Sequence, residues 1–274
     1  MSLYKNGSKW RPLDLLQNDH LTGTEVDSSS GTVFISSYTP GSNANIQAYN
    51  SSGDSLWSFQ FGEANSDTSA ESVSPDSDGG VFVTGTQGPP VQGGTKSNAY
   101  ALHLNATGAV QWQRTVGNTT GADIATSTAA DTESKLVYIT GSTTGVMGPD
   151  AGAPNSTVNS GLTDVFLSCL SGTDGSIQWT RQFGTKGFDV AARVALGRRG
   201  GVYVAGQLGT GSSPDSNESG SPQAFIGRWD YRGDRQFLVQ LNSTKEHKVT
   251  ALTIGKDDSS GEGAVYLAGH VGGT

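Results

Sequence analysis

The segment GGVYVAG at residues 200–206 decides the fold, because four close variants of it recur along the chain. They are GTVFISS at 31–37, GGVFVTG at 79–85, KLVYITG at 135–141 and GAVYLAG at 263–269. Each copy has the pattern of a tight turn followed by a buried strand, and successive copies start 48 to 65 residues apart. Repeats of this kind are typical of small β-sheets arranged around an axis.

Each repeat unit divides into four short stretches of strand length. A stretch of small residues such as DVAARVALG at 189–197 precedes the recurring segment, and an alternating one such as QAFIGRWD at 223–230 follows it. A fourth stretch begins, in each unit, with one large aromatic residue shortly after a turn glycine. These residues are Trp10, Trp57, Trp112, Trp179 and Phe237. We interpret their rings as wedges buried between neighbouring sheets.

The pattern predicts an all-β fold: one β-propeller domain over residues 1–274, built of about five four-stranded antiparallel blades. The units span roughly 19–61, 68–116, 123–182, 189–240 and 247–269, the last together with 3–15. Residues 247–269 supply only a first and a second strand, whereas 3–15 resemble a third and a fourth. Joined, the two ends would close the ring without an exposed sheet edge. The alternative is a fragment of a larger, seven-bladed propeller.

Residues 164–206 resemble the seven-bladed β-propeller repeat family called SBBP. The matching residues are Asp164, Phe166, Gly175, Trp179, Gly184, Asp189, Ala192, Gly201, Val202, Tyr203, Val204 and Gly206. The resemblance implies a propeller of the kind often found in secreted or surface-attached proteins, and it carries over no catalytic residue. SGTDGSIQWTRQFG at 171–184 is also similar to quinoprotein-type propeller repeats, but Cys169 is the only cysteine, which argues against the quinone-dependent enzymes.

The composition argues against nucleic-acid binding and against a transmembrane segment. A net charge of −8 is unfavourable for a nucleic-acid surface, which needs clustered Lys and Arg. No apolar run approaches the roughly 20 residues that span a bilayer, so we expect no transmembrane segment. Glycine is abundant, with 39 residues, as expected for many short strands joined by turns.

One set of candidate ligand-binding residues lies at the start of each innermost strand. Counting back from each recurring segment gives His20, Thr68, Asp123, Asp189 and Lys248. We expect these side chains to ring one mouth of the central channel, where Asp123 and Asp189 could bind a structural calcium ion. The competing interpretation is that each aspartate caps its own turn. We identify no catalytic residue, no other cofactor and no metal-binding motif.

Seven N-x-S/T sequons favour an extracellular or cell-surface location. Their asparagines are Asn6, Asn50, Asn105, Asn118, Asn155, Asn217 and Asn242. Nearly all fall in predicted turns or loops, where a glycan would face solvent.

The longest predicted connections share one face of the propeller, at residues 86–97, 142–163 and 207–222. Long polar loops in a compact array are commonly functional. We therefore expect a non-catalytic interaction or adhesion module that binds a protein or a glycan through this face. The alternatives are a polysaccharide hydrolase or lyase with its site at the channel mouth, and a structural spacer. A deep acidic pocket containing a carboxylate of raised pKa would favour the enzyme.

Overall fold

The computed structural model describes most of the chain. The ranges are 3–6, 9–12, 20–40, 43–62, 66–90, 96–117, 121–147, 161–209, 222–241, 245–255 and 263–272, with side-chain detail from residue 20 onward except at 66, 89–90 and 198. Four sheets each contain four strands, which pair antiparallel with their chain neighbours. This confirms the predicted all-β fold of four-stranded antiparallel units.

The strand bounds follow the repeat units. The first sheet holds β3 (His20–Val26), β4 (Val33–Tyr38), β5 (Ala44–Tyr49) and β6 (Ser55–Phe61). The second holds β7 (Ser66–Pro75), β8 (Val81–Pro90), β9 (Asn98–Leu104) and β10 (Val110–Thr115). The third holds β11 (Asp123–Asp131), β12 (Leu136–Thr143), β13 (Asp164–Ser171) and β14 (Ile177–Phe183). The fourth holds β15 (Val190–Leu196), β16 (Val202–Leu208), β17 (Gln223–Trp229) and β18 (Arg235–Gln240).

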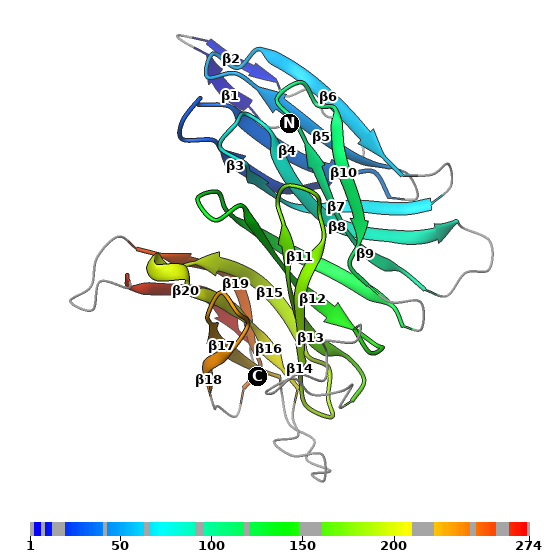
Figure 1. The fold of residues 1–274 in the computed structure, drawn as a ribbon, viewed down its shortest axis with the longest axis vertical. Coiled ribbons are helices and arrows are strands. Elements are labelled where there is room, and N and C mark those ends of the chain that lie inside the picture. The colour runs from blue at the N-terminus through cyan, green and yellow to red at the C-terminus, as the bar shows by residue number, and fades with distance from the viewer. Residues whose placement is uncertain are drawn as a thin grey trace.

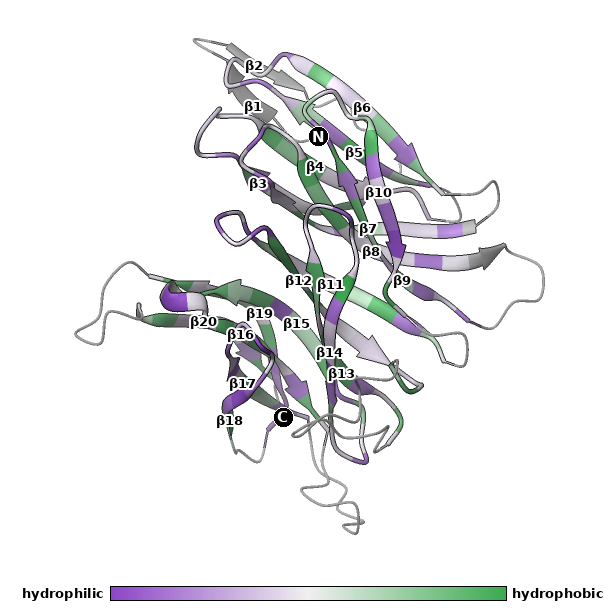
Figure 2. Cartoon of the chain, in the orientation of Figure 1, coloured by the Kyte–Doolittle hydropathy of each residue, from purple (hydrophilic) through white to green (hydrophobic). Residues whose placement is uncertain are grey.

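The sheets follow one another as a fan, from β3 at one end to β19 and β20 at the other (Figure 1). The first strands of successive units, namely β3, β7, β11, β15 and β19, contact each other in that order. Middle strands such as β5 are buried along their whole length, whereas the outer strand β10 is exposed at all positions but one. In hydropathy β10 is mostly hydrophilic, whereas β5 alternates between hydrophobic and hydrophilic residues (Figure 2). The strand of small residues therefore lies innermost, where the sheets converge.

The predicted fifth blade, joined from both ends of the chain, is not formed. β1 (Leu3–Asn6) pairs with β2 (Lys9–Pro12), and β19 (His247–Ile254) pairs with β20 (Val265–Val271), but these pairs are two separate sheets. They lie at opposite ends of the fan (Figure 1). β1 and β2 have four residues each, so they could form few backbone hydrogen bonds along β20. Those bonds would offset little of the conformational entropy lost on fixing β1 and β2 against it.

A recurring tryptophan contact joins neighbouring sheets. The indole N–H of Trp57 donates to the carbonyl of Ala106 at 3.0 Å, that of Trp112 to Gly172 at 2.9 Å, and that of Trp179 to Tyr231 at 3.0 Å. Each acceptor lies in the turn between the third and fourth strands of the next unit. We call this contact the Trp clamp.

The turn glycine in each clamp lies flat against the indole ring. Gly175, for example, has a φ of 71°, and an added Cβ would lie 2.6 Å from Cε3 of Trp112. Arg114 strengthens this junction, because its Nε donates to the carbonyl of Gly175 at 3.0 Å. Trp112 is 8% exposed, whereas Phe237, at the equivalent position of the fourth sheet, is 40% exposed. The ring of Trp10 lies outside the described side chains.

Candidate functional site

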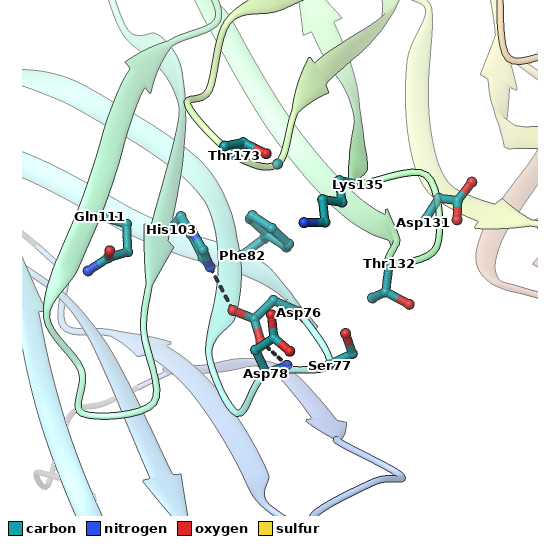
Figure 3. A pocket seen from close by; sticks show the side chains of 11 residues that line it. Asp76, Ser77, Asp78, Phe82, His103, Gln111, Asp131, Thr132, Lys135 and Thr173 are labelled. Carbon is teal, nitrogen blue, oxygen red and sulfur yellow. Dashed lines mark hydrogen bonds and ion pairs between the residues drawn. The ribbon is translucent and has the colours of Figure 1, made fainter.

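A cleft opens between the second and third sheets on the side of the short turns (Figure 3). Its volume is about 440 Å³. One wall comes from the second sheet: Asp76, Ser77, Asp78, Phe82, His103 and Gln111. The other comes from turns of the third sheet: Asp131, Thr132, Lys135, Gly172 and Thr173. We call this space the inter-sheet cleft.

Local turn chemistry builds both walls. Asp76 directly follows β7, and its Oδ1 accepts hydrogen bonds from the amides of Asp78 and Gly80, each at 2.8 Å. This Asx turn closes the 76–80 connection between β7 and β8. Ser77 has a φ of 71° and Lys135 a φ of 54°. Both values lie in the left-handed region, which is unfavourable for residues that have a Cβ. Each costs about 1 kcal/mol or more, and both residues line the cleft.

An aspartate–histidine pair lies at the base of the second-sheet wall. Asp76 Oδ2 and His103 Nε2 are 2.7 Å apart. Burial works to raise the pKa of Asp76, but the hydrogen bonds from His103 and from the two turn amides outweigh it and hold this pKa below its usual value. The imidazole also stacks on Phe82, with ring centroids 4.3 Å apart. The carboxylate of Asp76 therefore stays ionised and fixes the orientation of His103.

The second ring nitrogen of His103 is unavailable to a substrate. Its Nδ1 is buried and has no hydrogen-bond partner among the described residues. A general base must reach the proton that it removes, directly or through one water. The pair therefore holds the cleft wall in place and does not present a base to the cleft.

The rim of the cleft carries several kinds of polar group. Asp78, Gln111, Thr132 and Thr173 are exposed, and the ammonium of Lys135 extends toward Phe82 (Figure 3). Phe82 is 7% exposed and forms the floor. Such a surface can donate to and accept from many hydroxyl groups while one face of a ligand rests on an apolar ring.

The ring of residues predicted at the channel mouth is dispersed in the structure. Thr68, Asp123 and Asp189 are fully buried at the junctions between sheets. His20 is exposed and stacks on Tyr38 with centroids 5.3 Å apart. Lys248 is exposed and lines a cavity on the axis. These five side chains do not share one site.

Strand pairing explains why counting back misplaced two of them. Ala191 pairs with Gly206, and Val249 pairs with Gly269. His247, and not Lys248, is therefore the equivalent of Asp189. In the first sheet Leu21 pairs with Ser37, so His20 lies one residue beyond the equivalent of Asp189. The error arises because the turn between the first and second strands varies in length.

Asp123 and Asp189 both accept hydrogen bonds from nearby protein groups. Asp123 accepts a hydrogen bond from Thr143 Oγ1 at 2.5 Å. Asp189 accepts from Thr185 Oγ1 at 2.9 Å and from the amide of Gly209 at 2.7 Å. Burial raises the pKa of Asp189 to about 6 against these hydrogen bonds, and the nearby Asp164 carboxylate adds to the rise. The Asp189 carboxylate thus lies inside a sheet junction. Burial also raises the pKa of Glu25, which lines a cavity beside β3.

Other predicted features are only partly described. Across the described ranges, no three His, Cys, Asp or Glu side chains are grouped to hold a metal ion. In the same residues no helix is long and apolar enough to cross a membrane. Asn50 and Asn105 lie in turns, and Asn6 lies in β1. The remaining sequon asparagines lie outside the described residues: Asn118, Asn155, Asn217 and Asn242. Most of the residues in the three long connections also lie outside them.

Comparison with solved structures defines the fold. The GH93 α-L-arabinofuranosidase of Fusarium graminearum, in complex with arabinobiose, matches 93% of this chain and 77% of its own, with a TM-score of 0.60 and 10% identity. The chain has a β-propeller fold. A lignostilbene dioxygenase of Pseudomonas brassicacearum matches 91% of this chain and 57% of its own, with a TM-score of 0.51 and 11% identity.

The quinohemoprotein alcohol dehydrogenase of Comamonas testosteroni matches 93% of this propeller and 42% of its own chain, with a TM-score of 0.50 and 14% identity. No family model and no curated protein sequence matches the chain. The similarity is therefore one of fold, and these enzymes of unrelated chemistry do not indicate a shared activity.

Proposed function

We propose that this β-propeller is a non-catalytic binding module of a secreted or cell-surface protein, and that its inter-sheet cleft binds a glycan. The observation that carries the proposal is the composition of the cleft. Carboxylate, amide, hydroxyl and ammonium groups surround an aromatic floor, while the only histidine in the lining is bound to Asp76.

The cleft suits a short glycan segment better than a protein surface. Its volume of about 440 Å³ is that of a small-ligand site. A stable protein interface buries roughly 800 Å² on each partner, which would require surface well beyond these lining residues. Sugar hydroxyls both donate and accept, so they match the mixed rim formed by Asp78, Gln111 and Lys135.

The carboxylates argue against the glycosidase alternative. Glycoside hydrolysis needs a carboxylic acid of raised pKa beside the scissile bond and a second carboxylate across it. In the cleft the pKa of Asp76 is lowered, and its oxygens are bound to His103 and to the turn amides. The carboxylates of raised pKa, Asp189 and Glu25, do not line this cleft: Asp189 is 0% exposed, and Glu25 lines a separate cavity. We therefore assign binding, and not hydrolysis, to this site.

A glycan array followed by titration of the best ligand tests the proposal. Lys135→Ala and Gln111→Ala each remove a rim group and should weaken binding about tenfold, which corresponds to about 1.4 kcal/mol. Glu133→Gln is the matched control, because Glu133 is exposed in the same turn as Lys135 but does not line the cleft. Its affinity should equal that of the unmodified protein.

Three results would overturn the proposal. Equal affinity in all three variants would place the ligand elsewhere. Release of reducing sugar that is abolished by Asp78→Asn would identify an enzyme instead. Absence of binding to every glycan, with or without calcium, would favour the structural spacer.

A further inference from the structure

Two adjoining cavities lie where the innermost strands converge. They share no lining residue with the inter-sheet cleft. Their volumes are about 330 and 270 Å³. Thr22, Glu71 and Arg193 line both cavities, so the two are parts of one axial space. We call this space the axial cavity.

A repeated irregularity of the backbone supplies the lining. Each innermost strand has a register shift at the same place in its ladder, between Ala70 and Ser72 in β7, for example. A β-bulge of this kind adds one residue and re-aims its side chain. The extra residues are Thr22, Glu71, Thr126, Ala192 and Thr250. All five line the larger part of the axial cavity.

The threonines among them join the strands and are already bonded. Thr22 Oγ1 donates to the carbonyl of Ala70 in the next unit, and Thr126 Oγ1 donates to that of Ala191 at 2.9 Å. Thr250 Oγ1 donates to Ala268 within its own sheet at 3.3 Å. These hydroxyls account for the packing of the inner strands and leave the recognition of a ligand to other groups.

The charged residues of the axial cavity lack this internal pairing. Glu71 is half-buried, and its carboxylate forms no hydrogen bond or ion pair within the described part of the chain. Arg193 bonds only the adjacent carbonyl of Ala192, at 2.8 Å, and Lys248 is exposed. Neither cation comes within 4.0 Å of the Glu71 carboxylate. Glu25 lines the smaller part of the cavity as a second carboxylate, and it too forms no ion pair among the described residues. Two carboxylates and two cations thus share the axial cavity without neutralising one another.

We propose that the axial cavity binds a small zwitterion, with its ammonium group at Glu71 and its carboxylate at Arg193 and Lys248. The strands hold the opposite charges apart, so a ligand that carries both charges at a matching separation satisfies all three residues at once. Arg193 and Lys248 are exposed, but Glu71 is half-buried, and a partly desolvated carboxylate attracts an ammonium group more strongly than one in bulk water does. A ligand that carries both charges is therefore favoured over either single ion. The size of the cavity is that of a small-molecule site.

A series of ω-amino acids tests the proposal directly. Glycine, β-alanine, γ-aminobutyrate and 6-aminohexanoate increase the separation of the two charges stepwise, while butyrate and n-butylamine each supply one charge. Calorimetric titration should show tightest binding at one chain length, and at least tenfold weaker binding of the singly charged compounds. Raising the ionic strength should weaken the binding.

Matched variants separate this site from the rest of the protein. Glu71→Gln and Arg193→Gln should each reduce affinity for the best ω-amino acid at least tenfold, whereas Arg199→Gln, an exposed arginine in the turn before β16, should not. Lys135→Ala, in the inter-sheet cleft, should leave zwitterion binding unchanged, so the two proposals fail independently. Unaltered thermal unfolding of each variant excludes loss of structure.

Two outcomes would overturn the inference. One is that no ω-amino acid binds saturably at millimolar concentration. The other is that Glu71→Gln and Arg193→Gln bind the best compound as tightly as the unmodified protein does.

Discussion

Replacing Gly175 with alanine should weaken the clamp between the second and third sheets more than an ordinary glycine replacement does. Two penalties add at this position. The first is backbone strain, because a φ of 71° is left-handed and costs a residue with a Cβ about 1 kcal/mol or more. The second is overlap, because the new Cβ would lie 2.6 Å from Cε3 and 2.8 Å from Cδ2 of Trp112. Overpacking of this kind costs about 1–3 kcal/mol.

Gly200→Ala is a matched control, because it carries the backbone strain without the ring overlap. Gly200 has a φ of 73°, but an added Cβ would meet only the Cβ of Tyr231, at 3.8 Å. We therefore expect Gly200→Ala to lose about 1 kcal/mol and Gly175→Ala about 2–4 kcal/mol. The difference between the two variants measures the ring contact alone.

Urea unfolding monitored by tryptophan fluorescence provides the assay, with the free energy of unfolding taken from midpoint and slope. Because Gly172 accepts the Trp112 hydrogen bond and also lines the inter-sheet cleft, Gly175→Ala should weaken glycan binding as well. Equal stability of Gly175→Ala and Gly200→Ala would refute the clamp as the element that joins the sheets.

Three further predictions concern single side chains. Because the pKa of Asp189 is raised to about 6 in the folded protein, its protonated form favours folding below pH 4. That contribution, on the order of 3 kcal/mol, should be lost as the pH rises through 6. Chemical unfolding from pH 4 to 7 should show this decline, and Asp189→Asn should flatten it; an unchanged slope would contradict the assignment. Cys169 is 1% exposed and burial raises the pKa of its thiol to about 12, so a thiol reagent should label it only after unfolding, and rapid labelling of folded protein would contradict this. In a secretory host the turn residue Asn105 should carry a glycan that Asn105→Gln removes, as measured by intact mass; an unmodified Asn105 would count against export.

The buried pair of Asp164 and Asp189 shows how far a strand-entry aspartate can be interpreted from sequence. The repeat predicted that Asp189 lies at the start of an inner strand, and turn capping was one of the two interpretations of this aspartate. In the folded chain Asp189 faces a sheet junction and not the channel, because its carboxylate lies with that of Asp164 beside Gly184, which has no side chain. That proximity joins two different sheets, and no local pattern encodes it.

The inter-sheet cleft was not predicted, although one of its elements had a signal. The sequence 76–80, DSDGG, was recognisable as a turn, and the turn 131–135 lay at the same place in the next unit. Nothing in either turn indicates that the two face each other, because the separation of neighbouring sheets is set by the Trp112 clamp. The expected binding face, formed by long loops, lies largely outside the described residues.

The repeat alone determined the four-stranded units, their antiparallel order and the innermost place of the small-residue strand. These features depend on hydrophobic alternation and on turn glycines. Both act over a few residues, so they can be predicted from the sequence. Only the tertiary structure decided that the two ends form separate sheets, that one bulge per inner strand turns Glu71 toward the axis, and that turns of neighbouring sheets enclose a cleft. Those outcomes depend on packing between segments more than 40 residues apart, such as Trp112 on Gly172, and on one-residue changes of register that leave the local pattern intact.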